Sequence, residues 1–333
     1  MAIADFDVFE TDPVGAHQAR HLIIAFAACD SPDWAAAIEA LPAEHTAAAR
    51  QLLGSMRPSA QLRGEPDSLS PPHERALASA LGWPELADGL LPWAARQAAA
   101  RGLKSQGPWG QIRLCHWVMG REQASMSDPS LLPISASESL ALMQDMAPYF
   151  AADGLELHHL RPGQWLVQGQ PMDLPTASLE RVIGRDVDPW LAGGPAARLL
   201  RRLQNEMQML LYTHPINEAR AGRRELAINS LWFSGTGRLP AATRPPQAVH
   251  LSRLLAPAAM AGDWSAYAQA WFELDAQVLR PLLARQQAGE AVQLSLCGER
   301  GCLTLQTAGA SLMGRLAGLF RPSPWPRLLK EGL

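Results

Sequence analysis

The feature that most restricts the fold of this chain is a set of short apolar runs, each separated from the next by helical patterns. The runs lie at residues 21–28, 111–118, 228–234 and 292–297. Continuous apolar runs of this length are typical of strands that are buried on both faces. Strands that alternate with helices favour parallel pairing. The sequence therefore predicts an α/β protein with a mainly parallel sheet flanked by helices.

Helix signals follow two of the polar segments. The string Asp30-Ser31-Pro32-Asp33 is typical of an N-terminal cap with proline, with Asp30 as the expected cap residue, and it predicts a helix over residues 34–53. Residues 54–72 are rich in Gly, Pro and Ser and are expected to form a loop. Ser135 and Glu138 have the spacing of a capping box, which predicts a helix that continues to residue 150.

Charge and hydropathy limit the classes of function. The 333 residues carry a formal net charge of -3, which argues against a dedicated nucleic-acid-binding protein, because such proteins present a basic face. The sequence contains no stretch of 18 or more apolar residues, so no membrane span is predicted. The N-terminus is acidic and unlike a signal peptide. A cytoplasmic protein is expected.

The four cysteines do not form a metal-binding pattern. They stand at positions 29, 115, 297 and 302 and include no CxxC motif. Cys297 and Cys302 are the nearest pair, but no further Cys or His stands near them to complete a metal site. We therefore expect small buried side chains in a reducing compartment, and no bound metal or cofactor.

One long segment resembles a known family. His214-Pro215-Ile216-Asn217 is followed by Arg220 and then by the string Asn229–Gly237. This pattern resembles the archaeal-type cofactor-independent phosphoglycerate mutases, which carry HPVN..R and AN.IWLWGQG at the same spacing. The strings at residues 179–188 and 204–212 are similar to the RpfE-type regulatory proteins, a divergent branch of that family.

This resemblance implies an alkaline-phosphatase-like fold, in which a smaller α/β domain is inserted into a sheet domain. The implied core comprises residues 17–130 and 238–333, and the implied insert comprises residues 131–237. In the mutases two divalent metal ions drive phosphoryl transfer, and several carboxylates and histidines hold them.

The metal ligands of the mutases have no counterpart here. Where the family has Asp-Gly after the first strand, this chain has the apolar run Ala25–Ala28. Where the family has Asp-His after the last strand, it has Gly298-Glu299, and no histidine stands beyond residue 297. The sequence therefore predicts no catalytic residues and no metal site, because ligands scattered one at a time do not hold an ion.

The substrate-binding half of the family pattern is better preserved, and it implies a site for a small anion that bears phosphate or carboxylate. The candidate ligand-binding residues are His116, Trp117, Arg181, Arg185, Asn217, Arg220 and Asn229. Each also has a structural interpretation. The asparagines could bond the backbone, the histidine could be an ordinary buried one, and the arginines at 181 and 185 could form an exposed ion-pair face.

Three functions follow from these observations. The leading hypothesis is a degenerate, non-catalytic regulatory protein that binds a small anionic ligand or a protein partner. An apolar stripe between Leu312 and Phe320 would serve a partner, or would pack on the chain's own core. The first alternative is a metal-dependent mutase or phosphatase with remodelled ligands, namely Asp30, Glu299 and His116. The second is a nucleic-acid-associated accessory protein that uses its arginine-rich segments.

Overall fold

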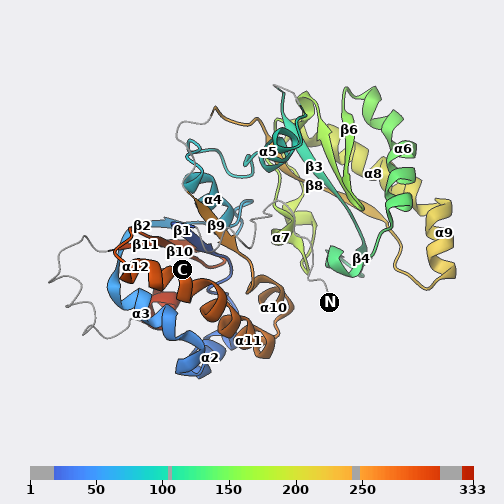
Figure 1. Ribbon diagram of the computed structural model, residues 1–333. Coiled ribbons are helices and arrows are strands. Elements are labelled where there is room, and N and C mark those ends of the chain that lie inside the picture. Colours follow the sequence, from blue (N-terminus) through green and yellow to red (C-terminus); the bar gives the residue numbers. More distant parts are fainter. Residues whose placement is uncertain (1–18, 104–106, 242–247, 308–324) are drawn as a thin grey trace. The chain divides into compact units, whose positions relative to one another are not determined.

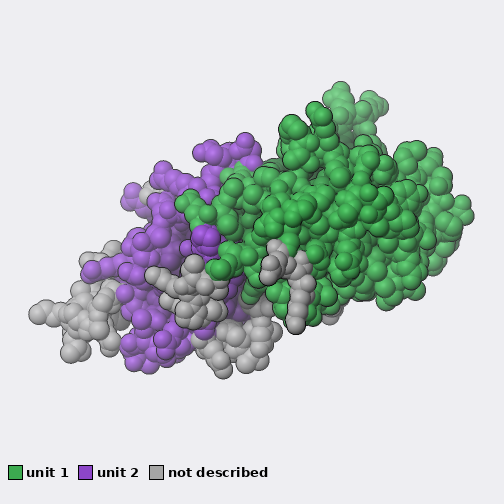
Figure 2. Space-filling view, turned by 90° about the horizontal axis from the view of Figure 1, so that it is seen from above, with its two compact units in different colours: residues 1–8, 68–70, 85–241 green, residues 9–67, 71–84, 242–333 purple. Residues whose placement is uncertain are grey.

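The computed structural model describes residues 19–103, 107–241, 248–307 and 325–333. These residues form two compact units (Figures 1 and 2). The described part of unit 1 consists of residues 68–70 and 85–241, and the rest of the described chain belongs to unit 2. Both units combine helices with a sheet, so the mixed α/β class expected from the sequence is confirmed.

Unit 2 contains a five-stranded sheet in the order β2-β11-β10-β1-β9. The strands are β1 (His21–Ile24), β2 (Met56–Arg63), β9 (Val249–Ser252), β10 (Gln293–Cys297) and β11 (Gly301–Thr307). Strand β1 runs parallel to β9 and β10, whereas β11 runs antiparallel to β10 and β2. The expected mainly parallel sheet is therefore wrong: the sheet is mixed, because a tight turn after β10 reverses the chain at once.

Helices lie on both sides of this sheet, with α4 on one side and α2, α3, α11 and α12 on the other (Figure 1). The helices of unit 2 are α2 (Pro32–Ala40), η1 (Ala43–Thr46), α3 (Ala47–Ser55), α4 (Pro72–Ala80), α10 (Ala256–Ala261), α11 (Trp264–Leu274), the π-helical η6 (Asp275–Leu279), α12 (Arg280–Gln287) and α14 (Arg327–Gly332). The single helix predicted over 34–53 is interrupted at Leu41 and Pro42, because proline cannot continue the backbone hydrogen-bond pattern.

Unit 1 is built on a four-stranded sheet in which every pairing is antiparallel. Its order is β6 (Glu156–Arg161), β7 (Gln164–Gln168), β3 (Trp109–Cys115) and β8 (Ser230–Gly237), and a separate ribbon joins β4 (Trp117–Met119) to β5 (Ala124–Met126). The helices of unit 1 are η2 (Pro129–Leu131), α5 (Trp93–Ala100), α6 (Ala136–Ala152), η3 (Gln170–Met172), α7 (Leu179–Val182), η4 (Asp188–Trp190), η5 (Pro195–Ala197), α8 (Arg198–Tyr212) and α9 (Pro215–Gly222).

Alternating side chains on these strands build a core on each face of the sheet. Ile112 and Leu114 of β3 pack in one cluster with Leu142 of α6 and Leu203 of α8. Trp109, which precedes them on β3, packs in a second cluster with the alanines of α5. The period-two pattern of a strand thus separates two sets of apolar contacts. The capping box of α6 is present as predicted, with Ser135 and Glu138 bonding each other's backbone.

The compact units differ in extent from the domains inferred by resemblance. The segment 131–237 lies within unit 1, but this unit begins earlier and takes in residues 85–130 as well. Strand β3 is the reason, because it pairs with β7 on one side and with β8 on the other. The expected apolar stripe at residues 312–320 lies outside the described residues.

Candidate functional site

In a parallel arrangement of strands, ligand-binding residues gather just beyond the carboxyl ends of the strands. In unit 2 this edge lies where β1, β9 and β10 end. We call Cys29, Asp30, Glu299 and Arg300 the carboxyl-edge cluster: the first two follow β1, and the last two follow β10. The edge itself is apolar at the end of β1, where Ala25, Ala27 and Ala28 are buried.

The backbone after β1 makes a sharp turn that is held from a neighbouring helix. Phe26 has a positive φ of 57°, which is uncommon for a residue with a side chain. The hydroxyl of Tyr267, on α11, donates a 2.8 Å hydrogen bond to the carbonyl oxygen of Phe26. Trp34 in turn donates to that hydroxyl over 3.1 Å. This bonded chain of buried side chains fixes the turn that leads into the cluster.

The two acids of the cluster are engaged within the protein. Arg300 donates from Nε to Oδ2 of Asp30 over 2.6 Å. Glu299 accepts a 3.2 Å hydrogen bond from the backbone N–H of Asp30 through Oε2. Burial raises the pKa of the neighbouring Cys29 thiol, and the negative charges of Glu299 and Asp30 raise it further. Cys29 is therefore protonated at neutral pH and is a poor nucleophile.

A second polar group at the same edge was not among the residues singled out in the sequence. Arg253 directly follows β9, and Glu74 lies in the first turn of α4. Burial lowers the pKa of Arg253 to about 10, and the charge of Glu74 acts against this shift. The position of Arg253, one residue after a short apolar strand, is the only sequence signal that could have indicated it. Among the described residues, no three His, Cys, Asp or Glu side chains converge as metal ligands would.

In unit 1, the two asparagines predicted to bind a ligand both bond the backbone. Asn217 donates from Nδ2 to the carbonyl oxygens of Leu211 and Ile228, over 2.8 and 2.7 Å, and accepts from the N–H of Ile228 over 2.9 Å. Asn229 accepts from the N–H of Trp117 over 2.7 Å and donates to its carbonyl oxygen over 2.8 Å. Asn217 therefore joins the end of α8 to the segment before β8, and Asn229 joins two segments that are 112 positions apart in sequence.

The predicted arginines occupy different environments. Arg220 is fully buried and donates to the carbonyl oxygens of Leu226 and Pro133, over 2.7 and 2.9 Å, and to Glu138 over 3.2 Å. Arg181 is buried in α7, whereas Arg185 is exposed in the turn after it. The structure thus brings a buried cation to the start of α6, where Glu138 belongs to the capping box.

The remaining predicted residues lie near the β4–β5 ribbon. His116 is half-buried, and its Nδ1 lies 2.8 Å from the carbonyl oxygen of Ala227. Trp117 packs near Trp232, with 6.4 Å between the ring centroids. These contacts are of the structural kind described above, and the role of the predicted residues toward a ligand stays a prediction.

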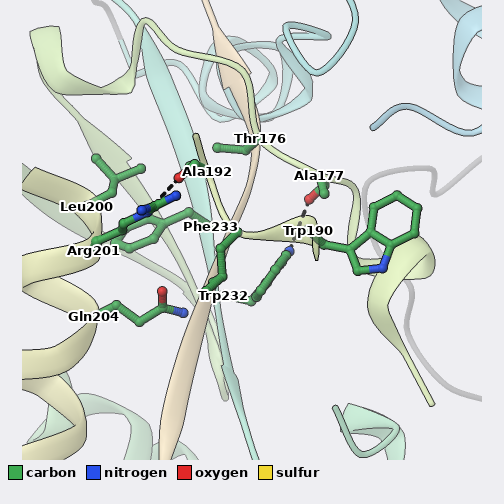
Figure 3. Close-up of a pocket in the computed structure, with 10 residues that line it drawn as sticks. Thr176, Ala177, Trp190, Ala192, Leu200, Arg201, Gln204, Trp232 and Phe233 are labelled. Carbon is green, nitrogen blue, oxygen red and sulfur yellow. Dashed lines mark hydrogen bonds between the residues drawn. The ribbon is translucent and has the colours of Figure 1, made fainter. Parts of the chain in front are cut away.

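A small cavity lies between β8 and α8 (Figure 3). Trp232 donates to the carbonyl oxygen of Ala177 over 3.0 Å, and Arg201 donates to that of Ala192 over 2.8 Å. Gln204 donates to the carbonyl oxygen of Leu231 over 2.7 Å. The free volume, ≈ 20 Å³, is close to what one water molecule needs. A metabolite would not fit there.

A larger open groove runs along α6, the second half of α8 and the start of α9, with a volume of ≈ 720 Å³. Its residues include Tyr149 and Met209, whose exposed fractions are 46% and 72%. Tyr212, three residues after Met209, is 83% exposed. Exposed apolar side chains that gather along one groove are typical of interaction surfaces. We call this surface the α6–α8 groove.

Comparison with known proteins gives distant similarities only. No family model matches the sequence, and no curated protein matches it. Among solved structures, a PH0037 protein from Pyrococcus horikoshii is similar, with 13% sequence identity, a TM-score of 0.43 and 89% of each chain covered. A cofactor-independent phosphoglycerate mutase from Thermoplasma acidophilum DSM 1728 is also similar, with 13% identity, a TM-score of 0.34, and 91% of this chain and 95% of that chain covered.

No helix among the described residues is both long and apolar enough to cross a lipid bilayer.

Proposed function

We propose that this protein is a regulatory relative of the cofactor-independent phosphoglycerate mutases, of the RpfE type, which binds a protein partner and does not turn over a substrate. The strings His214–Asn217 and Asn229–Gly237 support the relationship. The loss of catalysis rests on the carboxyl-edge cluster, and the binding role rests on the α6–α8 groove.

The ion pair between Asp30 and Arg300 is the observation that carries the proposal. A two-metal site holds its ions about 3.5–4 Å apart among several carboxylates and histidines. Here the carboxylate that follows β1 is bonded to a guanidinium over 2.6 Å. A cation that bound Asp30 would have to displace this positive charge. The other acid of the cluster, Glu299, accepts a backbone hydrogen bond beside it and keeps its charge, but a single carboxylate is fewer than the several ligands that two metals need.

The test of the catalytic half is phosphorus NMR with 3-phosphoglycerate, in the presence of Mn²⁺ or Mg²⁺ and again with a chelator. We expect no 2-phosphoglycerate and no free phosphate under any of these conditions. Conversion that requires the metal and stops with the chelator would contradict the proposal and would favour the remodelled-ligand enzyme. An Arg300→Ala variant is the matched control, because it exposes Asp30 to metal.

The α6–α8 groove supports a partner of a definite kind. Asp145, Glu206, Tyr149 and Met209 line it, and the carboxylate of Glu206 lies 3.7 Å from the guanidinium of Arg202. His214 is its only basic lining residue, and the Nε2 atom of His214 is already 3.0 Å from Asp145. Because a basic side chain lies beside each of the two acids, the exposed apolar side chains are the main feature of the groove, and they are complementary to a protein segment that carries apolar side chains.

To test whether the α6–α8 groove binds a protein partner, a photo-crosslinking amino acid replaces Met209 in the living cell. The same amino acid at Val118 is the control. Val118 is 49% exposed and belongs to the β4–β5 ribbon of the same unit. We expect one partner at Met209 and none at Val118. The purified partner must then bind the purified protein, and Met209→Lys must weaken this binding by about tenfold or more. Equal binding by the variant would contradict the proposal.

A small anion is the other ligand class that the sequence indicated. Native mass spectrometry with added 3-phosphoglycerate distinguishes a small-anion ligand from a protein partner. A single saturable adduct that Arg185→Ala removes, without any effect of Met209→Lys on the protein's interactions, would favour the anion over the protein partner.

A further inference from the structure

Cys297 and Cys302 face each other across the β10–β11 hairpin. The register of the two strands pairs them directly. The hydrogen bond from Gly298 N–H to the carbonyl oxygen of Gly301 closes the turn over 2.8 Å, and Thr307 bonds to Val292 over 3.1 Å at the far end. Hydrogen-bonded and non-hydrogen-bonded pairs alternate along an antiparallel ladder. Counting residue pairs along the hairpin from either of these hydrogen bonds shows that Cys297 and Cys302 are a non-hydrogen-bonded pair.

This position suits a disulfide. The Cα atoms of a non-hydrogen-bonded pair are about 4.5 Å apart, which lies within the range of about 4.4–6.8 Å seen across disulfides. The Sγ atoms of Cys297 and Cys302 lie 3.2 Å apart as free thiols. The bond between them could therefore form with a small movement of the side chains, while both strands keep their register.

The surroundings of the two sulfurs differ. The Cys297 thiol donates a hydrogen bond to the Cys302 sulfur, and this bond lowers the pKa of Cys302. Burial acts against this shift, and the hydroxyls of Thr304 and Ser295 favour it. Burial raises the pKa of Cys297. Ser295 and Thr304 are the next pair on the same face of the hairpin, with their hydroxyl oxygens 2.8 Å apart. Cys302 accepts the hydrogen bond between the two sulfurs, which places it as the attacking sulfur in the scheme below, since the thiolate is the nucleophile.

We propose that Cys297 and Cys302 are a redox-sensitive dithiol, which a small peroxide oxidises to a cross-strand disulfide. The Cys302 thiolate attacks one oxygen of hydrogen peroxide and the O–O bond breaks. Hydroxide departs, and Cys302 becomes a sulfenic acid. The Cys297 sulfur then attacks the sulfenic sulfur, the S–O bond breaks, and water leaves as the disulfide forms. In sum, two thiols and one peroxide give one disulfide and two waters. Both sulfurs are buried, so the oxidant must be small.

The disulfide would act on the carboxyl-edge cluster. Glu299 and Arg300 form the middle of the turn that the two cysteines enclose, and Arg300 bonds to Asp30. Closing this short loop removes freedom from the hairpin. The oxidised hairpin would therefore restrict the turn that carries Arg300, the partner of Asp30.

The test uses the full-length protein, treated with hydrogen peroxide and then with a thiol-blocking reagent under denaturing conditions. Trypsin cleaves after Arg300, between the two cysteines, and so separates peptides 286–300 and 301–315. We expect these peptides to run as one linked species, lighter than their sum by about 2 Da, until a reductant separates them. Cys29 and Cys115 remain blocked by the reagent.

The variants assign the roles of the two sulfurs. In the Cys297→Ser variant, peroxide should leave a sulfenic acid on Cys302, and dimedone should trap it. In the Cys302→Ser variant, dimedone should label Cys297 far less. Cys115→Ser is the control and should keep the link at the wild-type level. The proposal is wrong if the two wild-type peptides stay separate while Cys29 or Cys115 is oxidised, or if all four thiols survive a peroxide dose that oxidises free glutathione completely.

Discussion

Asn229 bonds both backbone groups of Trp117. Its Oδ1 accepts from the N–H over 2.7 Å, and its Nδ2 donates to the carbonyl oxygen over 2.8 Å. The amide thereby replaces a strand partner at the point where β3 has ended and β4 begins. Asn217 makes a comparable connection to Ile228. Two residues selected for their hydrogen-bonding capacity toward a ligand thus use that capacity within the fold.

The first prediction concerns this clamp. Asn229→Ala removes both bonds and leaves two backbone groups without a partner, so the free energy of unfolding should fall by roughly 2–4 kcal/mol. Asn229→Asp keeps the acceptor and loses the donor, and it should cost about half as much. Urea denaturation followed by tryptophan fluorescence measures both. Unchanged stability in the alanine variant would show that the clamp is not structural.

The second prediction compares two arginines that share their carboxylate partners. Arg220 and Arg223 both contact Glu138 and Glu225, but the exposed fractions of their side chains are 0% and 49%. Arg220→Ala leaves buried carbonyl oxygens and part of a carboxylate unpaired, so unfolding should be easier by roughly 3–5 kcal/mol. Arg223→Ala should change stability little, because water screens the exposed pair. Equal losses in the two variants would contradict the assigned burial.

The third prediction is a pH dependence. Burial lowers the pKa of His21 from 6.5 to about 4, and its Nε2 atom lies 2.8 Å from the hydroxyl of Ser295. The unfolded chain takes up a proton at higher pH than the folded chain, so stability falls as the pH is lowered from about 6.5 to about 4. The full loss is about 3 kcal/mol.

The His21→Asn variant provides the comparison for that prediction. Other groups also titrate in this range, so the relevant quantity is the difference in unfolding free energy between wild type and variant. This difference should shrink as the pH falls from 7 to 4. A difference that stays constant with pH would mean that His21 titrates alike in both states.

The fourth prediction concerns a buried carboxylate at a helix start. Asp275 is fully buried and accepts hydrogen bonds from the N–H groups of Ala48 and Ala49, over 3.2 and 2.9 Å, at the beginning of α3. Asp275→Ala should lower the unfolding free energy by roughly 3 kcal/mol, since two buried donors lose their partner. Asp275→Asn keeps one acceptor and should cost less. Asp263, which caps α11 at its exposed start, is the control, with a loss of about 1 kcal/mol on change to Ala.

The sequence predicted those parts of the fold that local patterns determine. The first strand, the capping box at Ser135 and the mixed α/β class follow from nearby residues. Strand β2 does not, because most of its residues are exposed and they include Pro58, and its pairing with β11 is what makes it a strand. The direction of β11 likewise depends on a tight turn, which an overall alternation of strands and helices does not reveal.

The candidate site divides in the same way. The sequence indicated Asn217, Arg220 and Asn229 as donors toward a small anion, with backbone bonding as the alternative for the two asparagines. The hydrogen bonds found are within the protein, and a role toward a ligand stays a prediction. Their acceptors could not be predicted, because Asn229 bonds a residue 112 positions away and Arg220 bonds one 87 positions away. The sequence does not indicate Arg253 and Glu74 for the same reason, since β9 and α4 meet only in the folded chain.

Strand β2 has one further consequence, for the behaviour of the protein at high concentration. Among the described residues it is the outermost strand of the five-stranded sheet, and an unpaired strand edge allows another chain to extend the ladder. Pro58 offers no N–H to such an intruder, the ladder is irregular opposite Leu305, and Arg57 and Arg63 bring like charges to the edge. These features oppose sheet-to-sheet aggregation, so the protein is expected to stay dispersed in concentrated solution.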